Sequence, residues 1–147
     1  GAATGAVAGL VAITPAAGFV GPMGSIAVGV GAGVLTFYAV RIRHKFGFDD
    51  ALEVAAVHGV GGVWGAIATG IFAVGGIGLV DGETEALVTN VIAVLATIAY
   101  SFIVTFVILK ILDVIPGLGL RADETEEDTG LDIALHGERA YVGDGAD

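Results

Sequence analysis

A single histidine, His58, lies within a long run of small and apolar residues, ALEVAAVHGVGGVWGAIATG, which extends from Ala51 to Gly70. No ionisable residue follows it until Asp81. If this segment crosses a bilayer, His58 is by default a candidate for function, because hydrocarbon penalises charge. A neutral imidazole offers one hydrogen-bond donor and one acceptor, so the ring could bind a small polar solute or relay a proton.

The alternative role for His58 is structural, as a hydrogen bond that ties two helices together. On a helix, His58 shares a broad face with small or apolar residues, which are Ala51, Val54, Ala55, Gly61, Gly62 and Gly65. We expect this face to point inward and His58 to lie near the middle of the membrane. We expect no metal site, because His44 and His136 belong to aqueous segments and Glu53 lies close to the cytoplasmic end.

The composition places the chain in the membrane class. Of its 147 residues, 55% are hydrophobic and only 15% are charged, whereas a soluble domain usually has about a quarter charged residues. The chain has no cysteine, which excludes disulfides and thiolate chemistry. It starts inside an apolar run without Met or a basic leader, so we interpret it as a fragment without a signal peptide.

Four apolar segments can cross a membrane, and together they occupy residues 1–113. They cover about 1–19, 23–40, 51–74 and 87–112. A span needs roughly 20 apolar residues, so the first two are short and the fourth can cross tilted. All basic residues fall either after the second segment or at and beyond the end of the fourth: Arg41, Arg43, Lys45, Lys110, Arg121 and Arg139. The positive-inside rule therefore predicts that these regions are cytoplasmic.

Residues 114–147 form an acidic tail. They contain nine carboxylates and two arginines, a formal charge of −7. The motif RADETEEDTG cannot form a core, but LDIALHGERAY regains apolar residues that could dock on a cytoplasmic face. The scarcity of lysine is typical of a halophilic source, and an ordinary acidic tail explains the same composition equally well.

Glycines recur at helical spacing in the first three segments. The repeats are Gly1, Gly5 and Gly9, then Gly29 and Gly33, then Gly61 and Gly65. Small residues at this spacing let helix backbones approach closely, so these helices should pack against other helices. The fourth segment has no glycine between Leu87 and Leu112, which is typical of a lipid-facing helix. We interpret Trp64 as a packing residue.

Three blocks of sequence, in order, resemble one known family. They are GAVAGLVAITPAAGFVGPMGS at 5–25, DDALEVAAVHGVGGVWGAIATGIF at 49–72 and GLRADETEEDTGLDIALHGERAY at 119–141. The chain resembles the C-terminal part of the ammonium transporter (Amt/Mep/Rh) family. The resemblance implies an all-α membrane protein, here helices eight to eleven of an eleven-helix bundle plus the cytoplasmic tail. It also implies a homotrimer in the plasma membrane, with ammonium or ammonia as substrate and no enzymatic activity, cofactor, metal or nucleic-acid partner.

The resemblance also implies roles for individual residues. His58 corresponds to the second of twin pore histidines, and Val54, one turn earlier, to an apolar pore-lining residue. Glu53 takes a position where the family often has Asp, and it would line the pore wall or support it structurally. Thr14 and Pro15 match a helix-breaking segment of helix eight, where they would line the pore wall or support it structurally.

For the tail, the resemblance implies a regulatory role. Arg121, His136 and Tyr141 would contribute to a surface that packs across the trimer, and a PII-class nitrogen regulator would block the cytoplasmic exits. These residues would find acidic, carbonyl or apolar partners on the cytoplasmic face. The alternative is a solvated appendage.

The implied mechanism is conduction of ammonium as neutral ammonia plus a separately relayed proton. The other pore histidine belongs to helices that precede this chain, so we expect the isolated chain to be a poor transporter. Two rival interpretations stay open from sequence alone: a membrane-anchored ammonium sensor or scaffold, and a non-functional truncated fragment.

Overall fold

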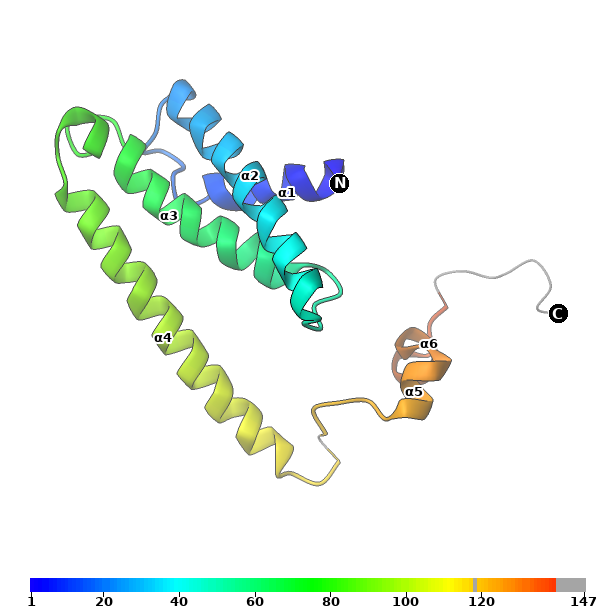
Figure 1. Cartoon of the computed structure of the whole chain (residues 1–147). Helices are drawn as coiled ribbons and strands as arrows, with labels where there is room; N and C mark the ends of the chain where they lie inside the picture. Colours follow the sequence, from blue (N-terminus) through cyan, green and yellow to red (C-terminus); the bar gives the residue numbers. More distant parts are fainter. Residues whose placement is uncertain (118, 140–147) are drawn as a thin grey trace. The chain divides into compact units, whose positions relative to one another are not determined.

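A computed structural model describes residues 1–117 and 119–139 of the chain (Figure 1). The helices of this part are α1 Ala2–Ile13, α2 Pro22–Phe46, η1 Ala55–Gly59, α3 Val60–Phe72, η2 Leu79–Asp81, α4 Glu85–Asp113, α5 Glu124–Thr129 and α6 Leu131–His136. The chain divides into two compact units, residues 1–99 and 100–147. The boundary between the units falls within α4.

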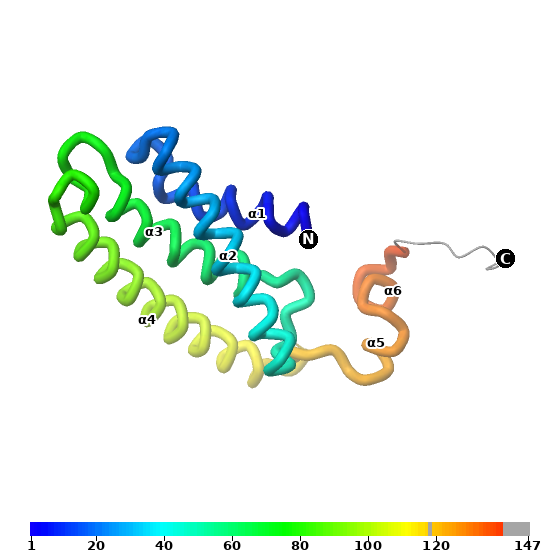
Figure 2. Tube along the Cα trace, turned by 45° about the horizontal axis from the view of Figure 1, so that its top comes forward, coloured from blue at the N-terminus to red at the C-terminus, as the bar shows by residue number. Residues whose placement is uncertain are grey.

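The first unit is a small bundle of α1, α2 and the η1–α3 helix. These helices contact one another and lie side by side in both views (Figures 1 and 2). Their common core is made of Ala12, Val28, Ala32 and Ala68. Such small side chains allow close helix approach where lipid provides no hydrophobic drive for association.

Gly65 marks the closest approach in this bundle. A side chain at this position would meet backbone atoms of Ala12 on α1. Gly61, one turn earlier, faces Val11 and Thr36. The expected close packing of this glycine pair against another helix is therefore confirmed. The other predicted glycines behave differently, since Gly1, Gly5, Gly9, Gly29 and Gly33 have open space around them within the described part of the chain.

Helix α1 ends at Ile13, short of the expected boundary near residue 19. Pro15 lacks a backbone N–H and cannot continue the helical ladder, and residues 14–19 form successive turns instead. A helix of 12 residues is only about 18 Å long.

Helix α2 is longer than the expected segment 23–40 and ends at Phe46. Pro22 stands in the first turn, where its missing N–H costs nothing. The basic residues expected in a loop form the last turn instead, where the helix dipole favours positive charge. Gly47 then ends the helix in the left-handed region, with φ of 66°.

Three of the described helices are long and apolar enough to cross a membrane: Pro22–Phe46, Ala55–Phe72 and Glu85–Asp113. None of the α4 residues is buried within the chain. Its side chains are mostly large and apolar, so α4 has the surface of a helix that contacts lipid or further helices. The chain is thus an all-α membrane protein.

The described part of the second unit holds the end of α4 and two short helices, α5 and α6. The acidic segment was expected not to form a core, and none of the residues of α5 is buried, although the segment does form a short helix. Asp123 and Glu126 make a reciprocal capping box at the start of α5, which satisfies free backbone donors. Acidic side chains in the first turn also suit the positive end of the helix dipole.

Candidate functional site: the His58 turn

His58 lies in a turn of π-helix, residues Ala55–Gly59, at the start of the third membrane helix. The N–H of Val60 reaches back to the carbonyl of Ala55 across this wider turn. Single π-turns inside α-helices are rare and frequently occur at functional sites. The irregular turn therefore holds His58, the one ionisable residue of the membrane helix Ala55–Phe72.

The π-turn divides its residues between two environments. Ala56 and Val57 are only 5% and 3% exposed, and the turn contacts both α1 and α2. His58 and Val54, in contrast, are exposed, and the exposed fraction of Val54 is 50%. Within the described residues the His58 ring makes no hydrogen bond to another helix, so it does not tie α1 or α2 to α3.

Two details of the expected His58 face are wrong. Gly61 and Gly65 are buried against α1, whereas His58 is exposed, so these residues do not share one face. The extra residue of the π-turn shifts the helical phase between them. His58 also lies in the first turn of the helix, because helical structure begins only at Val54 and not at Ala51.

The helix start is organised by Asp50. Its two carboxylate oxygens accept hydrogen bonds from the backbone N–H groups of Val54 and Ala55, both at 2.8 Å. These amides belong to the first turn, where helix donors have no partners within the helix. Asp is a preferred residue for this task, so its place just before the helix was the available signal in the sequence.

Glu53 pairs with Arg43, which belongs to the last turn of α2. Nη2 of Arg43 lies 2.5 Å from Oε1 of Glu53, and the side chains are 17% and 18% exposed. Nη1 of Arg43 donates to the carbonyl of Phe48 at 2.7 Å. His44 Nε2 lies 3.1 Å from the same Glu53 oxygen. From sequence, Arg43 indicates only which side of the membrane is cytoplasmic. Its pairing with Glu53 cannot be predicted, because it depends on how the intervening loop folds.

Thr14 and Pro15 lie in the turn after α1 and are exposed. The Thr14 hydroxyl donates to the carbonyl of Leu10 at 2.8 Å. It thus satisfies a carbonyl in the last turn of α1, where carbonyls lack helical partners. Both residues therefore have a local structural role at the end of α1, and a place in the pore wall stays a prediction.

Trp64 packs between helices, as expected. Its indole N–H donates to the carbonyl of Val28 at 2.9 Å, and its ring fills the space beside Gly31 on α2. The sequence analysis did not single out Gly31 as the position that accommodates this ring.

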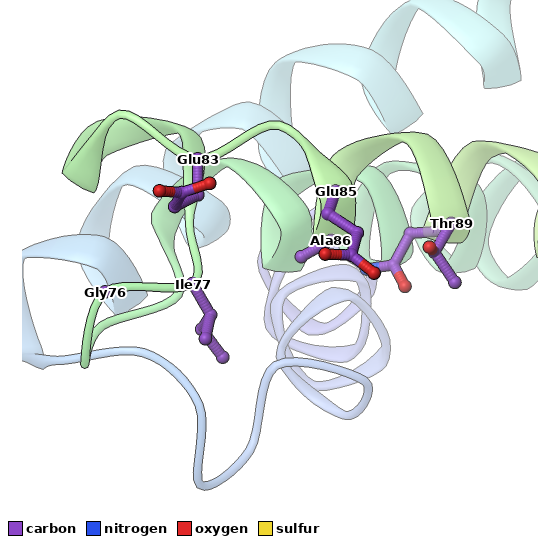
Figure 3. A pocket seen from close by; sticks show the side chains of 7 residues that line it. Gly76, Ile77, Glu83, Glu85, Ala86 and Thr89 are labelled. Atoms are coloured by element: carbon purple, nitrogen blue, oxygen red, sulfur yellow. The ribbon is translucent and has the colours of Figure 1, made fainter.

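A hollow of about 560 Å³ lies beyond the other end of α3. It is lined by Gly76, Ile77, Glu83, Glu85, Ala86, Thr89 and Asn90. Figure 3 shows Ile77 and Glu83 on the loop and Glu85 and Thr89 on the first turns of α4. The amide of Asn90 donates to the Ala66 carbonyl at 2.8 Å. Because α3 separates this hollow from the π-turn, it is not the predicted His58 site.

The tail residues with predicted roles are only partly described. Arg121 Nη2 lies 3.6 Å from Oε1 of Glu127 within the tail, and His136 is the exposed last residue of α6. Tyr141 lies outside the described residues. In the described part of the chain, no three His, Asp or Glu side chains gather in a way that could hold a metal ion.

Comparison with known proteins decides the family. A family model described as "Ammonium Transporter Family" matches residues 1–141. The chain belongs to the ammonium transporter family. Among curated family members, it is 50% identical to an ammonium transporter of Bacillus subtilis, with 96% of this chain and 36% of that protein covered. It is 45% identical to the ammonium transporter Amt1 of Archaeoglobus fulgidus, with 97% of this chain and 37% of that protein covered.

Solved structures of family members have the same fold over the matched region. The Mep2 structure from Saccharomyces cerevisiae matches with a TM-score of 0.77 and 32% identity, over 83% of this chain and 30% of that chain. The Mep2 structure from Candida albicans matches with a TM-score of 0.76 and 37% identity, over 84% of this chain and 29% of that chain. The chain thus spans about a third of the length of the family members that it matches.

Proposed function

We propose that this chain is the C-terminal part of an ammonium transporter, in which His58 and Val54 face the conducting path. The observation that carries the proposal is the division within the π-turn. The turn contacts α1 and α2, and Val57 is buried in it, whereas His58 is exposed. An exposed imidazole on an apolar helix needs either water, a substrate path or another polar group as its partner. A pore between this bundle and the preceding helices of the same transporter provides such a partner.

The proposed mechanism separates ammonia from its proton. An apolar pore cannot replace the hydration shell of ammonium or of a metal cation, so the bare ions are excluded. Ammonium can leave its proton behind and cross as neutral ammonia. His58 and a second histidine from the preceding helices would accept and donate hydrogen bonds to ammonia and relay the proton separately. Val54 would keep the cytoplasmic side of this path dry.

We further propose a homotrimer in the plasma membrane, with the tail in the cytoplasm. The basic last turn of α2 and Lys110 at the end of α4 agree with a cytoplasmic location for these helix ends. The exposed apolar residues of α6, which are Leu131, Ile133 and Leu135, could contact a cytoplasmic face. By family resemblance that surface, with Arg121, His136 and Tyr141, would govern conduction and bind a PII-class regulator.

The test is transport by a complete transporter that carries this chain. A chimera in which residues 1–147 replace the equivalent segment of the Bacillus subtilis relative would be reconstituted in liposomes. Uptake of methylammonium and exclusion of potassium are the expected results. A correctly assembled chimera that conducts neither ammonium nor methylammonium would contradict the proposal and favour a sensor or scaffold.

A further inference from the structure

The loop between α2 and the π-turn is held at both of its ends by one side chain, Arg43. One guanidinium nitrogen donates to the carbonyl of Phe48 near the start of the loop, and the other pairs with the carboxylate of Glu53 at its end. A planar guanidinium can bond two groups in a fixed geometry, which a lysine ammonium cannot. The loop is therefore clamped onto the last turn of α2.

Glu53 has an unfavourable backbone conformation that this clamp must maintain. Its φ is +57°, and it is the one non-glycine residue with positive φ in the described part of the chain. Such a conformation is energetically unfavourable for a non-glycine residue and persists only where surrounding contacts enforce it. The side chains of Glu53 and Arg43 are largely buried, and the buried atoms Oε2 of Glu53 and Nε of Arg43 have no hydrogen-bond partner among the described residues.

The same residue starts the helix that carries His58. The Glu53 carbonyl accepts the N–H of Val57 at 2.8 Å, and its own N–H donates to the carbonyl of Asp50 at 3.1 Å. Asp50 in turn binds the amides of Val54 and Ala55. The direction of the first turns, and therefore of His58, follows from the backbone of Glu53.

The geometry points to Arg43 as a positioning residue for His58. Through Glu53, it fixes the turn from which the π-helix starts and so sets the direction of the imidazole. The consequence for conduction rests on the proposed function of His58, whereas the consequence for the position of residue 58 does not. Arg43 does not touch the substrate. It acts through its contact with the Glu53 carboxylate, and so through the backbone of Glu53.

The experiment measures position and conduction separately in the reconstituted chimera. The chain has no cysteine, so His58→Cys in a cysteine-free background provides one thiol. Its labelling rate by a methanethiosulfonate reagent reports the exposure of residue 58. Arg43→Ala should change this rate severalfold. Arg41→Ala is the matched control. Arg41 lies two residues before Arg43 on α2, and its guanidinium contacts the Phe37 ring and not the loop.

Conduction is measured with His58 intact. Arg43→Ala should lower methylammonium uptake by about 10-fold or more, since displacement of a working group by about 1 Å can cost up to about 100-fold. Arg43→Lys keeps the charge and should restore part of the uptake, and Arg41→Ala should leave it unchanged. If Arg43→Ala does not assemble, Glu53→Gln replaces it, because the amide keeps the shape of the carboxylate and removes its charge.

An unchanged labelling rate in both Arg43→Ala and Glu53→Gln would overturn the positioning role. A second outcome distinguishes the positioning role of Arg43 from the pore function of His58. If the labelling rate changes while uptake is insensitive to both Arg43→Ala and His58→Ala, Arg43 positions residue 58 but the pore function of His58 is wrong.

Discussion

Val57 and His58 are consecutive residues of one π-turn, and they face opposite environments. Val57 is 3% exposed and lies on the side of the turn that packs against the rest of the bundle, whereas His58 is exposed. This relationship separates a packing residue from a candidate functional residue within a single turn. It also allows each role to be tested with a neighbouring control.

Val57→Ala should destabilise the protein and leave substrate selectivity unchanged. The smaller side chain leaves a cavity between η1 and its neighbouring helices, with an expected loss of about 1–3 kcal/mol in unfolding free energy. Thermal unfolding of the purified chimera in detergent measures this loss. An altered ratio of methylammonium to potassium uptake, at unchanged stability, would contradict the assignment of Val57 to the core.

Gly65→Ala should impair assembly more than Gly62→Ala does. A Cβ at position 65 would overlap backbone atoms of Ala12, whereas position 62 has open space within the described chain. Overpacking typically costs about 1–3 kcal/mol, and a backbone contact can relax less than a side-chain contact. The yield of assembled chimera in size-exclusion chromatography compares the two variants. Equal yields would show that α1 and α3 are not in close contact.

Trp64→Phe should lower stability by about 0.5–1.5 kcal/mol, the usual net contribution of one hydrogen bond. The phenyl ring still fills space beside Gly31, but the carbonyl of Val28 loses the indole donor. Thermal unfolding provides the measurement, with methylammonium uptake as the functional control. A strong effect on uptake at unchanged stability would give Trp64 a role in the conducting path.

The helical architecture and the family could be predicted from sequence because long apolar runs and three ordered motifs carry that information. The end of α2 could not, since the basic residues that mark topology also suit the last turn of a helix. The π-turn was missed because helical periodicity assumes a regular phase, and this phase changes after Ala55.

For the proposed site, the sequence predicts His58 and Val54 as pore residues and Glu53 as a supporting residue, whereas Arg43 served only as a signal of membrane topology. The clamp by Arg43 joins positions ten residues apart and depends on a left-handed Glu53, which sequence gives no reason to expect at a non-glycine residue. Asp50 carried a weak signal as a polar residue before a helix. The sequence thus predicts the candidate group, whereas the contact between Arg43 and Glu53 becomes visible only in the folded chain.

Truncation after Gly119 in the full-length chimera should lower conduction and abolish PII binding, if the tail has the regulatory role proposed here. The variant removes α5, α6 and the exposed apolar residues of α6. Uptake assays and a pull-down with a PII-class protein measure the two effects. Unchanged uptake together with unchanged PII binding would reduce the tail to a solvated appendage.

The most direct test of the account is methylammonium uptake by the reconstituted chimera with His58→Ala. We expect normal assembly and a loss of selective uptake of roughly 10-fold or more, because a polar partner left unpaired in the pore costs about 1–3 kcal/mol. Assembly is measured on the same preparation by size-exclusion chromatography. A fully assembled His58→Ala protein that takes up methylammonium at the unmodified rate would contradict the central claim that His58 lines the conducting path.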